Sequence, residues 1–164
     1  MARLGPEAEG GGLDAVRIAL IRPVLLTALI LATAPAPAAE RLVGRAKAVD
    51  GDTLEVAGIR VRLQGVAAPE VKHPGRPVAE PGGPEAAAFM ARLVDGRTAV
   101  CELGGQRSRK RRVGVCKLDG ADVGAEVIAA GLARDCPRFS KGRYATLEQP
   151  AARSLPLPGY CKPR

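Results

Sequence analysis

Carboxylates and arginines gather in one short segment of this chain, residues 49–70 (VDGDTLEVAGIRVRLQGVAAPE). The charged residues of the segment are Asp50, Asp52, Arg60, Arg62 and Glu70. Guanidinium groups bind phosphate through paired hydrogen bonds, and a carboxylate within hydrogen-bond reach of a water can act as a general base. These residue types therefore suit the hydrolysis of a phosphate ester, provided that the fold brings them together.

The hydrophobic pattern of the segment predicts a β-meander. Strands are expected over residues 42–48, 53–57 and 59–66. An Asp-Gly pair at residues 50–51 is a hairpin signal, and Gly58 marks the second turn. Because successive side chains point to opposite faces of a strand, Arg60 and Arg62 are expected on the same face of the third strand.

The rest of the chain predicts two further strands and at least two helices. Pro84 opens a helix whose apolar residues recur at helical spacing until Gly96, and Asp122 caps a shorter one that stops at Gly131. Strands are expected over residues 98–103 and 113–118, and one further helix within residues 144–154. Five short strands with a helix between the third and the fourth indicate a mainly β, α+β fold. We expect a five-stranded OB-type barrel with two or three flanking helices. The open face of such barrels commonly binds oligonucleotides.

Residues 1–39 have the composition of a signal peptide. Two arginines precede an apolar run, residues 24–34, which is shorter than the roughly 20 residues that a membrane-spanning helix needs. Small residues follow, and we expect cleavage after Ala36, Ala38 or Ala39. The product would be one domain of residues 40–164, exported to the periplasm or the cell exterior.

The net charge of +8 belongs entirely to this expected domain, because residues 1–39 carry three basic and three acidic residues. Its densest part is residues 107–112 (RSRKRR), and such a run attracts polyanions through counterion release. Nucleic acid is favoured over anionic envelope surfaces, although a charge run alone is most often a solvated loop. We expect a monomer that binds nucleic acid and does not stay inserted in a membrane after signal cleavage. The substrate contacts expected from the run are Arg109, Lys110 and Arg112.

The chain has four cysteines, an even number that favours disulfides in an exported protein. Cys101 and Cys116 end two strand-like segments on either side of the basic loop, as in a bridged hairpin, so we pair them. The remaining pair, Cys136 and Cys161, would tie the C-terminal segment to the domain. A zinc site is the competing interpretation, but the sequence has no CxxC spacing and a single histidine.

Several motifs occur in an order that resembles the thermonuclease family, the staphylococcal nuclease-like proteins. They are VDGDT, RVRLQGV followed by APE, KHP, GPEAAAF and DVGAEVIAAGLAR, within residues 45–154. The resemblance implies an OB barrel with flanking helices, and often a calcium-dependent phosphodiesterase that hydrolyses DNA and RNA. It further implies that Glu70 activates or orients the attacking water, while Arg62 and Arg111 hold the phosphate. Arg112 is the alternative for the second arginine.

The implied metal site departs from the family pattern at Ala67. Asp52 matches a calcium ligand of the family, and Asp50 and the carbonyl of Ala68 are possible further ligands. The resemblance implies a second metal-binding Asp three residues before Glu70, where this chain has Ala67. Calcium prefers six to eight oxygen ligands, so we expect a weakened site, and Ala67→Asp is expected to raise calcium-dependent activity.

Plainer interpretations exist for each of these residues. Asp50 and Asp52 are also common turn residues, and Glu70 could be a surface carboxylate paired with Arg62. Tyr144 is the aromatic residue we expect to contact substrate. Two functions therefore follow: an exported nuclease, or an OB domain that binds nucleic acid or another polyanion and whose catalysis has lapsed.

Overall fold

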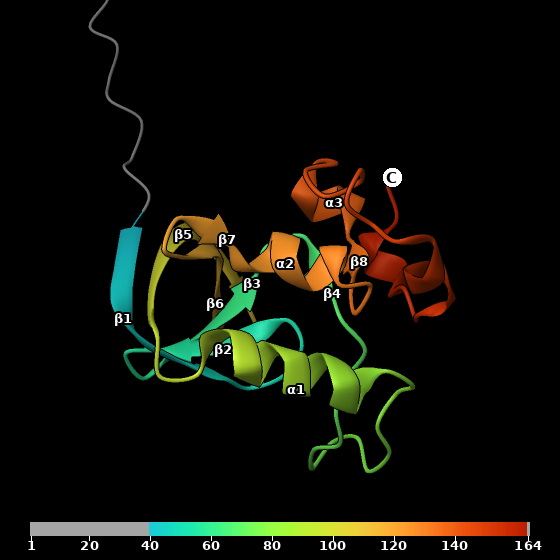
Figure 1. The fold of residues 1–164 in the computed structure, drawn as a ribbon, viewed down its shortest axis with the longest axis horizontal. Helices are drawn as coiled ribbons and strands as arrows, with labels where there is room; N and C mark the ends of the chain where they lie inside the picture. The colour runs from blue at the N-terminus through green and yellow to red at the C-terminus, as the bar shows by residue number, and fades with distance from the viewer. Residues whose placement is uncertain (1–39, 164) are drawn as a thin grey trace, which may run out of the picture. The chain divides into compact units, whose positions relative to one another are not determined.

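The computed structural model describes residues 40–163, which form a closed barrel of five strands with helices packed against it (Figure 1). The barrel strands are β1 (Glu40–Ala48), β2 (Thr53–Val56), β3 (Ile59–Leu63), β5 (Thr98–Ser108) and β6 (Arg111–Leu118). Neighbours pair antiparallel in the order β3-β2-β1-β5-β6, and a parallel pairing of β3 with β6 closes the barrel. The predicted OB-type α+β fold is confirmed. The predicted signal peptide lies outside the described residues.

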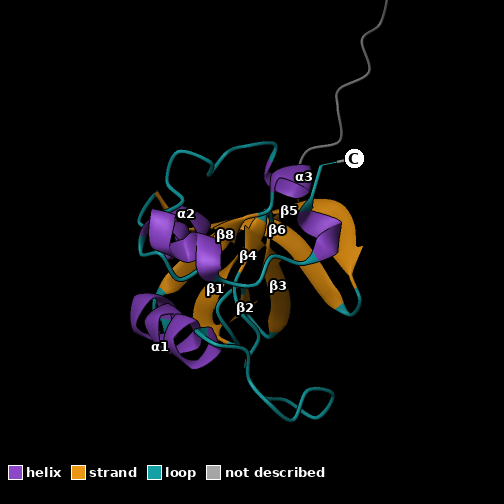
Figure 2. Ribbon diagram, turned by 90° about the vertical axis from the view of Figure 1, so that its right-hand side faces the viewer, coloured by secondary structure: helices purple, strands orange, loops and turns teal. Residues whose placement is uncertain are grey.

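Within the described residues, three α-helices lie outside the barrel strands (Figure 2). They are α1 (Gly83–Val94), α2 (Val123–Ala129) and α3 (Pro137–Ser140). Helix α1 has its proline in the first turn, and buries Ala86, Met90 and Val94 at helical spacing. The Asp122 carboxylate caps α2 by accepting hydrogen bonds from the backbone N–H groups of residues 124 and 125, at 2.8 and 3.3 Å. The two helices predicted to begin near Pro84 and Asp122 are present. No helix among residues 40–163 is long and apolar enough to cross a membrane.

The barrel interior is almost entirely aliphatic, in a chain that has two Phe, two Tyr and no Trp. Leu54, Val56, Val61 and Leu103 are among its buried side chains. The first predicted disulfide lies in this core, where Cys101 on β5 directly faces its partner Cys116 on β6. Both sulfurs are shielded from solvent, so this cross-link joins two strands that the backbone ladder already holds together.

The predicted third strand, residues 59–66, is divided in two. Strand β3 ends at Leu63, and a separate β4 (Val66–Ala67) pairs with β8 (Arg134–Asp135). The cause is Gly65, whose φ of 79° turns the chain and whose carbonyl accepts a hydrogen bond from the Cys136 N–H. A side chain at Gly65 would collide with the backbone of Ser140.

The basic run was predicted to be a loop, but most of it lies in strands. Strand β5 continues to Ser108 and β6 begins at Arg111, so only Arg109 and Lys110 form the turn. A register shift between Gly104 and Arg107 precedes this extension. The alternation of side chains along a strand then places Arg111 and its neighbour Arg112 on opposite faces of the hairpin.

The C-terminal segment differs from the helix predicted over residues 144–154. It contains turns and two short 3₁₀ helices, η1 (Pro150–Ser154) and η2 (Gly159–Cys161). The prolines at positions 150, 156 and 158 prevent a continuous helix because they lack the backbone N–H. The second predicted disulfide, Cys136–Cys161, ties the end of this segment to the start of α3.

Candidate active site

An ion pair between Asp52 and Arg62 occupies the centre of the predicted site. Asp52 follows the turn after β1, and Arg62 faces it from β3. The Asp52 Oδ1 atom accepts hydrogen bonds from Arg62 Nη1 at 2.7 Å and from Thr53 Oγ1 at 3.1 Å. Its Oδ2 atom accepts one from the Ala68 N–H at 3.2 Å. Both oxygens of this carboxylate, which is only 3% exposed, are therefore engaged by protein groups.

Burial dominates the electrostatics of this pair. It raises the pKa of the Asp52 carboxyl; the Arg62 charge opposes the rise and the nearby Asp50 charge adds to it. Burial alone would lower the pKa of the Arg62 guanidinium, but the charges of Asp52, Tyr160, Asp50 and Glu70 together outweigh that effect, so the net shift of the pKa is upward. Arg62 is consequently a permanent positive charge held in a fixed direction.

Arg111 joins this pair through a shared hydroxyl. Its Nη1 atom donates to Thr53 Oγ1 at 2.9 Å, and the same hydroxyl donates to Asp52. Its Nη2 atom donates to Ser108 Oγ at 3.3 Å. The two arginines are thus held on one hydrogen-bonded chain that runs across three strands, which fixes their relative positions.

Glu70 stands on a loop whose backbone is held from both ends. Its N–H donates to the Glu80 carboxylate at 3.0 Å, and its carbonyl accepts from the Glu80 N–H at 2.9 Å. Arg76 pairs with the same Glu80 carboxylate at 2.8 Å. Any side chain at Gly83 would strike the Glu70 carbonyl, so a glycine is needed there. This packing holds Glu70 in place where the chain leaves the barrel.

Arg62, Glu70 and Arg111 line one cleft of about 390 Å³. A second cleft, of about 760 Å³, begins at Glu70 and Arg111 and is also lined by Asp50 and the turn residues Arg109 and Lys110. The structure therefore brings together five of the residues that the sequence singled out for phosphate and nucleic-acid contact. They are Arg62, Glu70, Arg109, Lys110 and Arg111.

Two predicted contact residues are placed elsewhere. Arg112 points the other way from Arg111 and pairs with Glu40, with Nη2 and Oε2 2.6 Å apart. Tyr144 is 2% exposed and donates to the Asp122 carboxylate at 3.0 Å, so it supports the cap of α2. The geometry favours Arg111 over Arg112 as the second arginine and does not support a substrate contact by Tyr144.

The donor set does not fit a calcium ion. Asp52 already faces the Arg62 guanidinium, and Asp50 uses Oδ1 to accept the Asp52 N–H at 3.0 Å. Within residues 40–163, no three Asp, Glu, His or Cys side chains gather closely enough to hold a metal ion. Ala67, where a second carboxylate was expected, is 1% exposed and packs against Cys136 and Cys161. The Cys136–Cys161 disulfide therefore occupies the space next to the Ala67 side chain.

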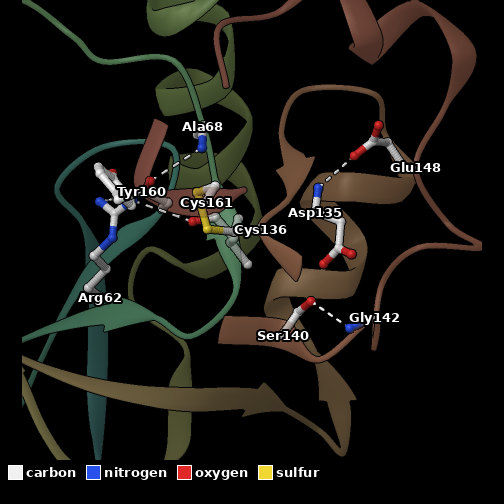
Figure 3. Close-up of a disulfide and its surroundings, with 11 residues drawn as sticks. Arg62, Ala68, Asp135, Cys136, Ser140, Gly142, Glu148, Tyr160 and Cys161 are labelled. Carbon is white, nitrogen blue, oxygen red and sulfur yellow. Dashed lines mark hydrogen bonds and ion pairs between the residues drawn. A yellow bond between two sulfur atoms is a disulfide. The ribbon is translucent and has the colours of Figure 1, made fainter. Parts of the chain in front are cut away.

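The C-terminal segment supplies a wall of the cleft that the sequence analysis did not assign. Pro156, Leu157, Pro158 and Tyr160 line the cleft of about 390 Å³. Figure 3 shows the Arg62 guanidinium beside Tyr160, with the Cys136–Cys161 bond next to them. Tyr160 directly precedes Cys161. The predicted Cys136–Cys161 disulfide could therefore have indicated that Tyr160 lies against the domain.

Comparison with known proteins agrees with this geometry. Residues 60–153 match the family described as "Staphylococcal nuclease homologue". The chain belongs to this family. A curated relative, the "Succinoglycan biosynthesis protein ExoI" of Rhizobium meliloti (strain 1021), is 40% identical over 130 residues, which cover 76% of this chain and 68% of that protein. Members of the family generally depend on calcium and act on nucleic acids.

Proposed function

We propose that this protein is an exported nuclease that hydrolyses phosphodiester bonds of DNA, RNA or both. The observation that carries the proposal is the shared cleft of Arg62, Glu70 and Arg111. The match of residues 60–153 to a family of nuclease homologues supports the proposal, because all three residues lie within the matched range. The apolar N-terminal run, with its small-residue ending, and the two disulfides support export.

In the proposed reaction, the two arginines bind the non-bridging oxygens of one phosphodiester. Glu70 accepts a proton from a water as its oxygen attacks phosphorus, and the bond from phosphorus to one ester oxygen breaks. That oxygen leaves and takes up a proton. The phosphorane-like transition state carries more negative charge than the ground state, so fixed guanidinium groups stabilise it preferentially. Because hydrogen bonds to Asp52 and Thr53 already hold the two arginines, their side chains need to move little as negative charge develops on the phosphate oxygens.

The role of calcium is where this chain departs from its family. The resemblance assigned calcium to Asp52, Asp50 and the Ala68 carbonyl, but the Asp52 and Asp50 carboxylates already accept hydrogen bonds from protein groups. Arg62 already neutralises Asp52 in the structure. We therefore propose that cleavage by this protein responds only weakly to added calcium.

The test is cleavage of labelled single-stranded DNA and RNA by the purified protein, its Glu70→Gln variant and its Arg62→Ala variant. Each is assayed with EDTA and over titrations of calcium and manganese. We expect wild-type cleavage to exceed that of Glu70→Gln by about 100-fold or more, the usual contribution of a general base. Equal rates in wild type and Glu70→Gln under every metal condition would refute the nuclease assignment.

A second candidate is a polyanion-binding OB domain without catalytic activity. Two observations favour it: the absent carboxylate at Ala67, and a relative named for succinoglycan biosynthesis rather than for nuclease activity. This function predicts salt-dependent binding of nucleic acid or of an acidic polysaccharide with no cleavage. The same assay separates the two candidates, because only the nuclease releases product.

A further inference from the structure

Arg76 is a charged residue of the cleft that the roles proposed above do not use. It lies on the loop between Glu70 and Glu80, outside the barrel strands. Four charged residues line both the cleft of about 390 Å³ and the larger cleft of about 760 Å³: Glu70, Arg76, Arg109 and Arg111. Arg76 therefore stands at the boundary of the two clefts, together with the proposed general base and one of the two proposed phosphate-binding arginines.

The backbone around Arg76 is held in a tight turn. The Arg76 N–H donates to the His73 carbonyl at 2.8 Å, and the His73 N–H donates to the Arg76 carbonyl at 2.9 Å. The Gly75 N–H donates to His73 Nδ1 at 3.2 Å. Pro74 and Pro77 restrict the backbone on either side of this pairing. The turn therefore fixes where the Arg76 side chain begins, while the side chain itself is 43% exposed and can change direction.

Arg76 has more unused hydrogen-bond donors than Arg62 or Arg111. Within residues 40–163, only its Nη1 atom has a hydrogen-bond partner, the Glu80 carboxylate at 2.8 Å. By contrast, both Nη atoms of Arg62 and both of Arg111 donate to protein groups of the site. An ion pair as exposed as that of Arg76 and Glu80 contributes little stability. Arg76 can therefore exchange Glu80 for a phosphate at little cost.

The proposed reaction requires a further positive group. Negative charge on the oxygens of phosphorus rises as the water attacks, and guanidinium groups bind such oxygens through paired hydrogen bonds. We propose that Arg76 is a third phosphate-binding arginine, which leaves Glu80 when substrate binds and donates from Nε and Nη2 to a non-bridging oxygen of the scissile phosphodiester. The inference rests on the proposed function for its reaction.

A purely structural alternative is that Arg76 only holds Glu80 in place. The Glu80 carboxylate accepts the Glu70 N–H at 3.0 Å, so Arg76 would then support the position of Glu70 without touching substrate. The two roles differ in their dependence on salt, because only a phosphate contact releases a counterion when the strand binds.

The first test measures the salt dependence of binding in the Glu70→Gln background, where cleavage does not interfere. The affinity for a fluorescent oligothymidylate is determined over a series of salt concentrations, and the slope of log affinity against log salt is compared. We expect Arg76→Ala to reduce the magnitude of the slope by about 0.7, the contribution of one phosphate contact on a single strand. Arg97→Ala should leave the slope unchanged. It is the matched control, since the Arg97 side chain is 46% exposed, pairs with Asp119 at 2.6 Å and lines neither cleft.

A Glu80→Gln substitution in the same background separates the two roles of Arg76. Glutamine keeps a side-chain oxygen that can accept the Glu70 N–H, but it lacks the charge that holds Arg76. A phosphate contact by Arg76 predicts tighter binding of the strand, by up to about fivefold, because the competing carboxylate is gone. This gain should be lost when Arg76→Ala is added, since Glu80 then has no arginine to hold back.

Single-turnover cleavage by proteins that keep Glu70 measures the catalytic part of the proposal. Arg76→Ala should lower the rate at saturating protein by about 100-fold, the lower end of the range for one lost donor to a developing negative charge. Arg97→Ala should change it by less than about threefold. Arg76→Lys keeps the charge without the planar fork, so it should retain the salt slope and recover part of the rate.

Three results would overturn the proposal. One is an Arg76→Ala protein whose salt slope matches that of Arg97→Ala. Another is a Glu80→Gln protein that binds the strand more weakly, as expected if Arg76 acts only by holding Glu80. The third is an Arg76→Ala protein with a reduced slope but an unchanged cleavage rate, which would place Arg76 on a phosphate other than the scissile one. A wild type no faster than Glu70→Gln would instead refute the proposed function, and the salt slope would still test the phosphate contact of Arg76.

Discussion

The two sides of the candidate active site differ in their access to solvent. Arg62, Glu70 and Arg111 line the cleft, and we call them the phosphate side. Asp52 and Ala67, which we call the metal side, are 3% and 1% exposed. The phosphate side presents its charged groups to the cleft, whereas the metal side consists of a buried alanine and a carboxylate that is already paired with Arg62.

The difference shows that a buried carboxylate can take its positive partner from a side chain of the same fold. A buried carboxylate needs a cation or several hydrogen-bond donors, because burial of an unpaired charge is costly. In this chain the Arg62 guanidinium and the donors of Thr53 and Ala68 meet that need. The disulfide at Ala67 then excludes water from the place where a second carboxylate would stand. The metal side has become a structural support for the phosphate side.

Removal of the Asp52 carboxylate should cause the largest loss of folding stability, because it leaves the buried Arg62 guanidinium without its ion-pair partner. Asp52→Ala is expected to lower the free energy of unfolding by about 3 to 5 kcal/mol, the range for breaking a buried ion pair from one side. Urea titration followed by circular dichroism measures it. Glu40→Ala is the matched control, since it breaks the exposed pair with Arg112 and should leave the midpoint unchanged. Equal shifts in both variants would contradict the support role of the metal side.

The phosphate side is probed by a pair of adjacent arginines. Arg111→Ala should lower kcat by about 100- to 1000-fold, as removal of one fixed donor to a developing negative charge does in other enzymes. Arg112→Ala should change kcat by less than about threefold, because Arg112 faces Glu40 on the opposite side of the hairpin. Single-turnover cleavage of a labelled strand measures both. The reverse order of effects would assign the second arginine of the site to Arg112.

The fold and most of the phosphate side could be predicted from the sequence, since both follow from local patterns. Alternation of apolar and polar residues located the strands, and motif order singled out Arg62, Glu70 and Arg111, which line one cleft in the structure. The continuation of β5 and β6 through the basic run was missed because like charges resemble a solvated loop. Pairing of the two strands overrides that local preference.

The metal side and the C-terminal wall could not be predicted, because they depend on contacts between distant segments. The sequence showed that Ala67 lacks a carboxylate, but not that Cys136 and Cys161 would cover it. Likewise, Tyr144 and Tyr160 are equivalent in a sequence. Only the fold buries the first beside Asp122 and leaves the second at the cleft.

Restoring the missing carboxylate tests whether the metal side can still hold calcium. The sequence alone predicted a gain of calcium-dependent activity from Ala67→Asp, and the structure reverses that expectation. An aspartate would be buried against Cys136 and Cys161, so we expect a loss of about 1 to 3 kcal/mol in unfolding free energy and no gain in calcium affinity. Calorimetric titration with calcium and thermal unfolding check the two parts. Tight calcium binding by the variant would show that the metal site persists.

The smallest change in unfolding free energy is expected from a substitution of Tyr144. This variant tests whether the buried tyrosine has only a structural role, unlike Tyr160 at the cleft. Tyr144→Phe removes a single hydrogen bond to Asp122, which keeps its bonds to the α2 backbone, so the cost should be about 1 kcal/mol with unchanged cleavage. Burial raises the pKa of the Tyr144 hydroxyl from 10.0 to about 12, and the charge on Asp122 adds to the rise. Because the unfolded chain loses this proton near pH 10 and the folded one near pH 12, the hydroxyl's contribution is complete below pH 10 and declines as the pH rises to 12. The stability difference between wild type and Tyr144→Phe, measured by denaturant unfolding between pH 8 and about pH 12, should therefore shrink across that window. A stability difference that stays constant with pH would contradict the raised pKa of the Tyr144 hydroxyl. A variant that loses cleavage at pH 8 would place Tyr144 in contact with substrate.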